Sequence, residues 1–168
     1  MPDKEPALAG VHAAVAELGA AAERVGVAWT TPRAPGKWSP SQVVEHVARI
    51  MEESASVVSN RPSKFPTIPF FLRPIARILV FKRTLRRNAF PKMKAIAAFV
   101  PAAGSTTPAD GCVRLQGALT RFEQACRDRA ANGQDVASSI FGRVSVADFA
   151  RFQELHVRHH ILQMPGAA

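Results

Sequence analysis

Signals that start helices recur along this chain, and they constrain its fold more than any other feature of the sequence. At three places a hydroxyl residue is followed three positions later by Gln or Asp, which is the pattern of a capped helix start. The pairs are Ser39 with Gln42, Thr107 with Asp110, and Ser145 with Asp148. Apolar residues then recur at spacings of three and four, the period of an amphipathic helix. These patterns predict helices over residues 39–60, 107–133 and 145–164, and periodicity alone predicts another over residues 6–25.

Four amphipathic helices without strand-like alternation predict an all-α fold, a four-helix bundle around one hydrophobic core. The length of 168 residues suits a single domain over residues 1–168. Residues 61–107, here called the crossover segment, connect the second and third helices and contain six prolines. We expect this segment to be irregular, apart from a short basic helix at about residues 74–87.

The positive charge of the chain is concentrated in one part of the crossover segment. Residues 61–94 contain ten Lys or Arg and no Asp or Glu, whereas the remainder holds twelve basic and thirteen acidic residues. Within residues 69–87, PFFLRPIARILVFKRTLRR, six basic residues are mixed with apolar ones. This is the composition of a helix that lies in the interface of an anionic membrane, so residues 61–94 are a candidate docking surface.

Two other interpretations of this basic segment stay open. Its charges suit nucleic acid, but no DNA- or RNA-binding motif accompanies them, which argues against such a partner. The plainer interpretation is a solvated basic face whose apolar residues cover one end of the bundle or form a homodimer contact. Those apolar residues are Phe70, Phe71, Ile75, Leu79 and Phe81.

Features that relate to the cellular compartment favour the cytoplasm. The chain has no run of about 18 apolar residues, and its N-terminus does not resemble a signal peptide. Cys112 and Cys126 would lie about 21 Å apart on one helix, too far for a disulfide. Unpaired thiols fit a reducing compartment. We therefore expect a cytoplasmic protein, in peripheral contact with a membrane if the basic segment docks there.

The last predicted helix concentrates the histidines of the chain, because three of the five fall within residues 156–160. At about 100° per residue, His156 and His160 project onto the apolar stripe that faces the interior of the bundle. His159 projects onto the edge of this stripe. On the second helix, His46 lies close enough to the apolar face to meet a neighbouring helix. The stripe also carries Phe149, Phe152 and Gln163, and the opposite face carries Arg151, Glu154 and Arg158.

Buried imidazoles need partners, because an unsatisfied polar group in the core costs about 1–3 kcal/mol. Two histidines one turn apart can reach a single cation, and a third from the second helix would place three nitrogens around an ion such as Zn²⁺. The alternative is that each histidine is an ordinary core residue held by hydrogen bonds. A zinc-protease motif is excluded, because H-E-x-x-H requires Glu after the first His, and Val157 stands there.

Two stretches, KWSPSQVVEHVARI and FGRVSVADFARFQELHVRHHILQM, resemble the DinB-like superfamily. More narrowly, they are similar to the branch called domain of unknown function 1569, whose last helix typically reads H-x-x-H-H-x-x-Q. The resemblance implies a four-helix bundle in which three histidines hold a divalent cation, often zinc or nickel. Position by position, the implied ligands are His46, His156 and His160, and Gln163 supports a ligand or lines the pocket.

The resemblance also implies a reaction on a small molecule. Characterised members of the superfamily include metal-dependent transferases and isomerases that use low-molecular-weight thiols, and others are regarded as hydrolases. Because Glu45 projects toward solvent, no carboxylate base is evident, which favours thiol transfer over hydrolysis. We expect Phe149 and Phe152 to form an apolar wall and His159 to donate a proton to the product. The alternative functions are a non-catalytic bundle that docks on a membrane or a protein partner, and a purely structural bundle.

Overall fold

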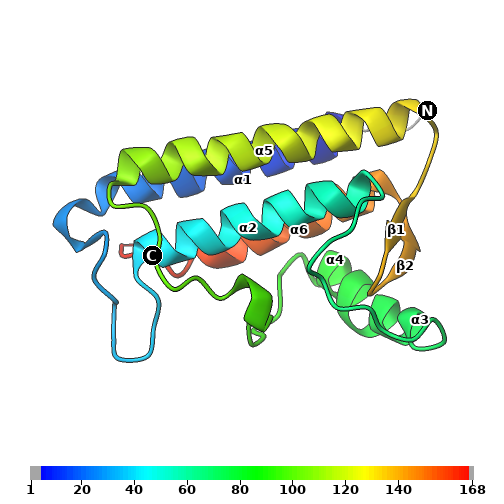
Figure 1. The fold of residues 1–168 in the computed structure, drawn as a ribbon, viewed down its shortest axis with the longest axis horizontal. Coiled ribbons are helices and arrows are strands. Elements are labelled where there is room, and N and C mark those ends of the chain that lie inside the picture. Colours follow the sequence, from blue (N-terminus) through cyan, green and yellow to red (C-terminus); the bar gives the residue numbers. More distant parts are fainter. Residues whose placement is uncertain (1–4, 167–168) are drawn as a thin grey trace.

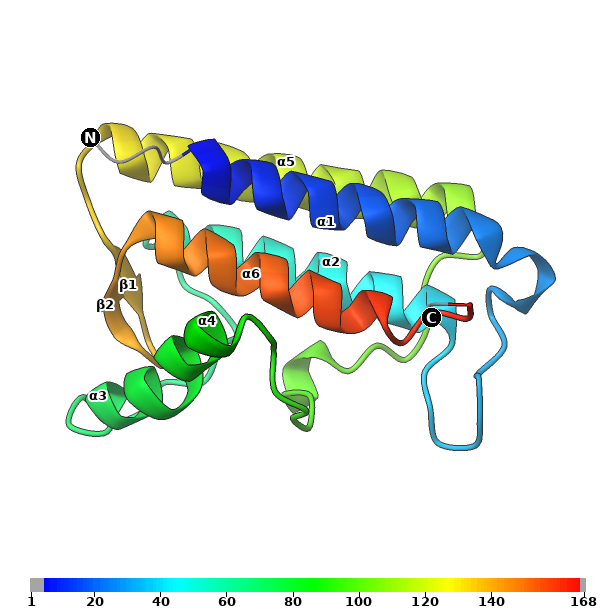
Figure 2. The same ribbon diagram turned by 180° about the vertical axis from the view of Figure 1, so that it is seen from behind.

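The computed structural model describes residues 5–166 and is mainly helical, as expected (Figure 1). Its long helices are α1 (Glu5–Arg24), α2 (Pro40–Val58), α5 (Pro108–Ala131) and α6 (Val146–Ile161). They lie side by side in two layers, with α1 beside α5 and α2 beside α6 (Figures 1 and 2). A short 3-10 turn, η1 (Gly26–Ala28), and a loop join α1 to α2.

The helix starts form for the reasons that the sequence indicates. Ser39 caps α2, because its side chain accepts the backbone N–H of Gln42 and the side chain of Gln42 accepts the backbone N–H of Ser39 in return. Thr107 and Ser145 cap α5 and α6 by accepting an N–H group from the first turn of each helix. Caps satisfy N–H groups that a helix end leaves unpaired, so the starts are confirmed within a residue or two.

The interior between the two layers is filled by aliphatic and aromatic side chains. The most extensive packing joins α2 to α5 and α1 to α6. The largest fully buried side chains among the described residues include Leu18, Met51, Phe81, Phe99, Leu115, Leu119, Phe122 and Met164. Phe81 and Phe99 come from the crossover segment, so this segment is part of the core rather than a free loop.

The crossover segment contains the expected basic helix. Helix α3 (Arg73–Ala76), the π-helical turn η2 (Arg77–Lys82) and α4 (Arg83–Arg87) follow one another without a break. The helix ends at Asn88, whose φ of 52° lies in the left-handed region that closes many helices. Farther along, the 3-10 turn η3 (Ala97–Phe99) packs against α2.

A small antiparallel sheet joins α5 to α6, and it corrects the all-α expectation. Strand β1 (Val136–Ser138) pairs with β2 (Gly142–Val144), and Val136 lies opposite Val144. The turn between the strands is held by Ser138, whose hydroxyl accepts two backbone N–H groups. Strands of three residues are too short for an alternating pattern to stand out in a sequence, which is why the hairpin was not predicted.

One helix face differs from the projections. Glu154 was expected on the solvent side of α6, but it is buried and accepts hydrogen bonds from Arg151 and Arg158. The physical reason is that α6 contacts α1, α2 and α4, so more of its circumference is covered than one apolar stripe accounts for.

One interpretation of the basic segment expected its apolar residues to cover one end of the long helices. Most of them do not. Phe81 is buried, but Phe70, Phe71, Ile75 and Leu79 are exposed. Helix α4 packs against α6, and Phe81 of η2 packs on Phe152 of α6, whereas α3 lies at a corner of the molecule (Figures 1 and 2). Within residues 5–166, no helix has both the length and the apolar character needed to cross a bilayer.

Candidate metal centre

Three histidines meet between α2 and α6. His46 lies in the first half of α2, and His156 and His160 lie one turn apart in the second half of α6. All three are buried, with at most 7% of each residue exposed, and one ring nitrogen from each lies within 4.8 Å of the other two. The fold therefore brings together the three residues that the sequence analysis nominated, here called the histidine cluster.

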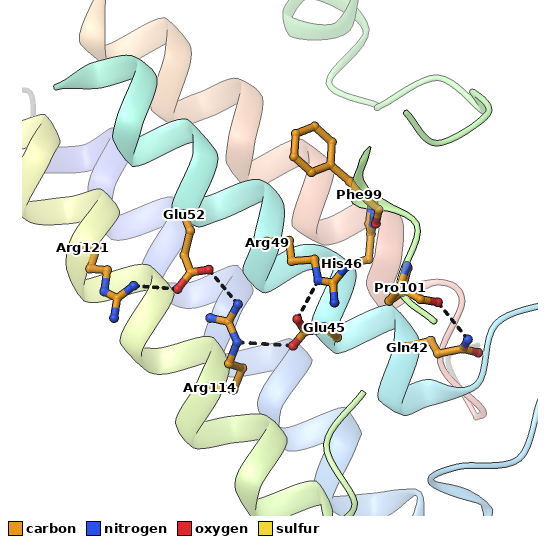
Figure 3. A network of polar contacts seen from close by, with 9 residues as sticks. All are labelled: Gln42, Glu45, His46, Arg49, Glu52, Phe99, Pro101, Arg114 and Arg121. Atoms are coloured by element: carbon orange, nitrogen blue, oxygen red, sulfur yellow. Dashed lines mark hydrogen bonds and ion pairs between the residues drawn. The ribbon is translucent and has the colours of Figure 1, made fainter. Parts of the chain in front are cut away.

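The crossover segment orients His46. The Nδ1–H of His46 donates to the backbone carbonyl of Phe99 at 2.9 Å (Figure 3). Phe99 ends the turn η3, and its buried ring packs on that of Phe65, so this carbonyl is held in place. A histidine that donates through Nδ1 keeps a lone pair on Nε2, which is the tautomer that a metal ligand needs.

Gln163 orients His160 in the same way. The Nδ1–H of His160 donates to the side-chain oxygen of Gln163 at 3.1 Å, and the amide nitrogen of Gln163 donates to Nε2 of His159 at 3.2 Å. One amide thereby links two neighbouring histidines and leaves Nε2 of His160 to face His156. The tautomers are assigned from this hydrogen-bond pattern. Gln163 thus contacts His160 from the side away from the cluster.

The remaining imidazole, His156, faces His160 directly. Their Nε2 atoms lie 3.1 Å apart. Because Nδ1 of His160 is bonded to Gln163, either His156 donates a proton to His160, or both lone pairs point at a shared cation. A core hydrogen bond and a pair of metal ligands therefore differ here in the tautomer of His156, whose proton lies on Nε2 in the first case and on Nδ1 in the second.

Burial keeps the three imidazoles neutral. It lowers the pKa of His46, and it lowers the pKa of His156 well below the ordinary value, with a further contribution from the neighbouring histidines. The pKa of His160 falls to about 3, mainly through burial and secondly through the charge of His46. Neutral imidazole is the form that binds a cation. At about pH 7 the three histidines therefore release few or no protons when a cation binds.

Aromatic rings close the histidine cluster. The ring centroids of Trp38 and His46 lie 4.7 Å apart, and Phe90 meets His156 edge to face at 5.0 Å. The sequence analysis missed both residues. Trp38 stands directly before the cap of α2, where an apolar residue often packs back on the first turn, and this signal could have found it. Phe90 lies in irregular chain, where no periodicity marks it.

The two phenylalanines expected to form an apolar wall lie in different surroundings. The ring of Phe152 packs at 5.2 Å on that of Phe90, which contacts His156. Phe149 is buried as well, and its ring lies 6.4 Å from that of Phe122 on α5. The wall beside the histidines therefore consists of Phe90 backed by Phe152, and Phe149 belongs to the main core.

His159 lies at the edge of the cluster, as its projection indicated. It is half-buried, and its ring centroid lies 5.2 Å from that of His160 and 5.7 Å from that of Phe90. Burial lowers the pKa of His159, and the positive charge of Lys92 lowers it further. A histidine that is neutral at about pH 7 is better suited to accept a proton than to donate one.

The acidic residues of α2 form a ladder of ion pairs with α5, away from the histidines (Figure 3). Glu45 accepts a hydrogen bond from Arg49 at 2.7 Å and lies 3.3 Å from Arg114. Glu52 pairs with Arg114 at 2.7 Å and with Arg121 at 2.8 Å. Glu45 was expected to meet solvent, but its arginine partner on α5 turns it toward that helix. Among residues 5–166, the group that could hold a metal contains histidines and no carboxylate.

The donor set fits a divalent cation. Nitrogens bound at about 2.0–2.1 Å to a tetrahedral ion lie roughly 3.3 Å from one another. The Nε2 atoms of His156 and His160 are already 3.1 Å apart, and a ring nitrogen of His46 lies within 4.8 Å of both histidines. The hydrogen bonds that His46 and His160 make through Nδ1 are the usual support of metal-binding histidines.

A match over nearly the whole chain gives the family. The family model described as protein of unknown function (DUF1569) matches residues 8–165. The chain belongs to the DUF1569 family. The DUF1569 match includes the whole histidine cluster together with Trp38 and Gln163. No curated protein and no solved structure matches the chain.

Proposed function

We propose that this DUF1569 protein is a metal-dependent enzyme of the DinB-like type, which acts on a small molecule at the histidine cluster. One observation carries the proposal. Three buried imidazoles converge, and hydrogen bonds through Nδ1 turn His46 and His160 so that their Nε2 lone pairs remain available. Partners on Nδ1 of this kind are the usual support of metal-binding histidines.

The arrangement of the long helices supports the DinB-like assignment. Helices α1, α2, α5 and α6 pack chiefly in neighbouring pairs, α2 with α5, α5 with α1, and α1 with α6, which is the plan of a four-helix bundle. The histidines come from the second and the last of these helices. Both features agree with what the sequence resemblance implies.

Zn²⁺ or Ni²⁺ is the cation that three imidazole ligands favour. When bound, it would supply a Lewis acid with at least one open coordination position, because three protein ligands leave room for another. His46, His156 and His160 would hold it, and Gln163 and the carbonyl of Phe99 would keep two of these rings in orientation.

The residues around the cluster are suited to a small substrate with an apolar part. Phe90 and Trp38 keep water away from the imidazoles, and Phe152 backs Phe90. His159, neutral and half-buried at the edge, takes up the proton that the substrate releases. We propose this acceptor role in place of the donor role expected from the sequence, because a lowered pKa leaves the ring without an additional proton to donate at about pH 7.

A thiol co-substrate fits this site better than water does. No carboxylate belongs to the cluster within residues 5–166, and His159, whose ring centroid lies 5.2 Å from that of His160, is the proton acceptor that we propose. A free thiol has a pKa of about 8.5 and gives up its proton to a neutral imidazole far more readily than water does. We therefore propose thiol-dependent transfer or isomerisation first, and hydrolysis second.

A titration of the cobalt-substituted protein with small thiols tests the proposal. We expect a thiolate-to-cobalt charge-transfer band in the wild type and its loss in His156→Ala. His12→Ala, which changes an exposed histidine of α1, is the matched control and should keep the band. Metal-dependent cleavage of a chromogenic ester without such a band would shift the function to hydrolysis. A protein that takes up no cobalt would refute metal dependence.

A further inference from the structure

Exposed apolar side chains crowd the outer end of the crossover helix. Within ten residues, six large apolar residues are between 41% and 78% exposed. They are Phe70, Phe71, Leu72, Ile75, Ile78 and Leu79, here called the apolar tip. The rings of Phe70 and Phe71 meet edge to face, with centroids 5.7 Å apart. Contiguous apolar surface of this kind on a protein marks a place that a partner covers.

The helix that carries the apolar tip is anchored at its other end. Phe81 is buried, and its ring lies 5.1 Å from that of Phe141 and 5.0 Å from that of Phe152. Helix α4 packs against α6, whereas α3 lies at a corner of the molecule, away from the long helices (Figures 1 and 2). The tip therefore projects from a fixed base and is not a loose end of chain.

The two basic residues within the apolar run are turned back toward the body of the protein. Nε of Arg73 donates to the carbonyl of Ile68, and Nη1 of Arg77 donates to the carbonyl of Arg143 in β2. Helical spacing places both on the side opposite Ile75. The tip therefore stays apolar although its sequence contains two arginines.

The next turns of the same helix carry exposed positive charge. Lys82, Arg83, Arg86 and Arg87, here called the basic collar, are all exposed. In the part of the chain that the structure describes, none of the four forms an ion pair with a carboxylate. The collar begins three residues after Leu79, the last residue of the tip. The exposed surface of this helix is therefore apolar first and basic afterwards.

The apolar tip and the basic collar together favour one class of partner over the others. A symmetric contact with a second copy would bring two basic collars together, and like charges across an interface repel. Nucleic acid would meet the collar but leave the apolar tip in water. An anionic lipid surface satisfies both parts, because apolar side chains enter the acyl boundary while basic groups stay at the headgroups.

We propose that residues 70–87 dock this protein on an anionic membrane surface. The apolar tip enters the interface, and the basic collar contacts lipid phosphates. Helix α4 packs on α6, which carries His156 and His160, so docking holds the histidine cluster at a fixed distance from the lipid. This docking does not depend on whether the cluster binds a metal.

Co-sedimentation with vesicles tests the proposal on the full chain. We expect retention on vesicles of phosphatidylcholine mixed with phosphatidylglycerol, none on phosphatidylcholine alone, and release at high salt. Arg83→Ser/Arg86→Ser/Arg87→Ser should lower the partition coefficient by about 100-fold, because each basic side chain near an anionic surface contributes roughly fivefold. Phe70→Ser/Phe71→Ser should lower it by at least about tenfold.

Matched variants at the other end of the molecule control for charge and apolar area. Arg24→Ser/Arg33→Ser/Lys37→Ser removes three exposed charges, and Val27→Ser/Val113→Ser removes two exposed apolar side chains. Both controls should bind vesicles as the wild type does. Equal retention of every variant, or no retention on anionic vesicles, would overturn the proposal. A dimer that Phe70→Ser/Phe71→Ser dissociates, without vesicle binding, would assign the surface to a second copy.

Discussion

Nδ1 of His46 lies 2.9 Å from the carbonyl oxygen of Phe99, which follows it by 53 residues. Through this bond, a backbone group of the crossover segment orients a side chain of α2. The ring of Phe99 is 1% exposed and packs on Phe65, so the position of the carbonyl depends on the packing of the crossover. The stability of the crossover and the geometry of the histidine cluster are therefore coupled.

Phe99→Ala should disturb both properties together. We expect the free energy of unfolding to fall by about 3–5 kcal/mol, as for other buried aromatic residues. Cation affinity should fall as well, because His46 loses its fixed partner. Val100→Ala, at the neighbouring position and 47% exposed, should change neither. Urea unfolding and competition with a chromophoric chelator give the two quantities. Wild-type affinity in Phe99→Ala would show that the crossover does not orient His46.

Gln163 should influence cation binding without touching the cation. Gln163→Leu removes the acceptor for Nδ1 of His160, and we expect a loss of affinity of about 10–100-fold. Gln163→Glu keeps an acceptor and should retain most of the affinity. Leu162→Ala changes an exposed neighbour and serves as control. The same chelator competition measures all three variants, and unchanged affinity in Gln163→Leu would remove Gln163 from the site.

Acid should destabilise the metal-free protein in a defined range. The pKa values of His46, His156 and His160 are lowered in the folded state. The unfolded chain binds these protons at about pH 6.5, so it binds more protons than the folded state below that pH. The free energy of unfolding should then fall by up to about 1.4 kcal/mol per pH unit for each histidine that stays neutral.

Urea unfolding in the presence of a chelator, repeated from neutral pH to about pH 5, measures this dependence. His160→Leu removes one of the titrating groups and should give a shallower slope than the wild type. His12→Ala changes an exposed histidine and should leave the slope as it is. A wild-type stability that does not change over this range would mean that the imidazoles are not held neutral by burial.

Two glycines of α1 should respond to alanine with opposite signs. A Cβ at Gly10 would overlap the carboxylate of Glu154, which Arg151 and Arg158 hold in place. Gly10→Ala should lower the free energy of unfolding by about 1–3 kcal/mol. A Cβ at Gly19 would lie 3.7 Å from Sγ of Cys112, an ordinary contact, so Gly19→Ala should raise it by about 0.5–1 kcal/mol. Thermal unfolding of the two variants measures both changes. If Gly10→Ala also stabilised the protein, Glu154 would have to move aside freely.

The long helices were predictable because their signals are local. Ser39, Thr107 and Ser145 cap helices through groups three residues away, so no tertiary information is needed. Burial on these helices was harder to predict. Glu154 is polar and buried because two arginines on its own helix satisfy it while α1 covers it, and a single apolar stripe does not contain this information.

The candidate site likewise has a part that the sequence predicts and a part that it does not. His156 and His160 share a helix face, so their proximity follows from helical geometry, and His46 could be added because it adjoins the apolar face of α2. Phe90 and the carbonyl of Phe99 come from irregular chain, where no period relates position to direction. Their places depend on how the crossover packs, which only the three-dimensional structure shows.

The metal content of protein purified without an affinity tag is the most direct test of the central claim. We expect elemental analysis to find about one Zn²⁺ or Ni²⁺ per chain, as three imidazoles at one site imply. His46→Ala, His156→Ala and His160→Ala should each lose the metal, and His12→Ala should keep it. A wild-type protein that stays metal-free after dialysis against Zn²⁺ and Ni²⁺, or a metal content that survives all three cluster substitutions, would contradict the claim.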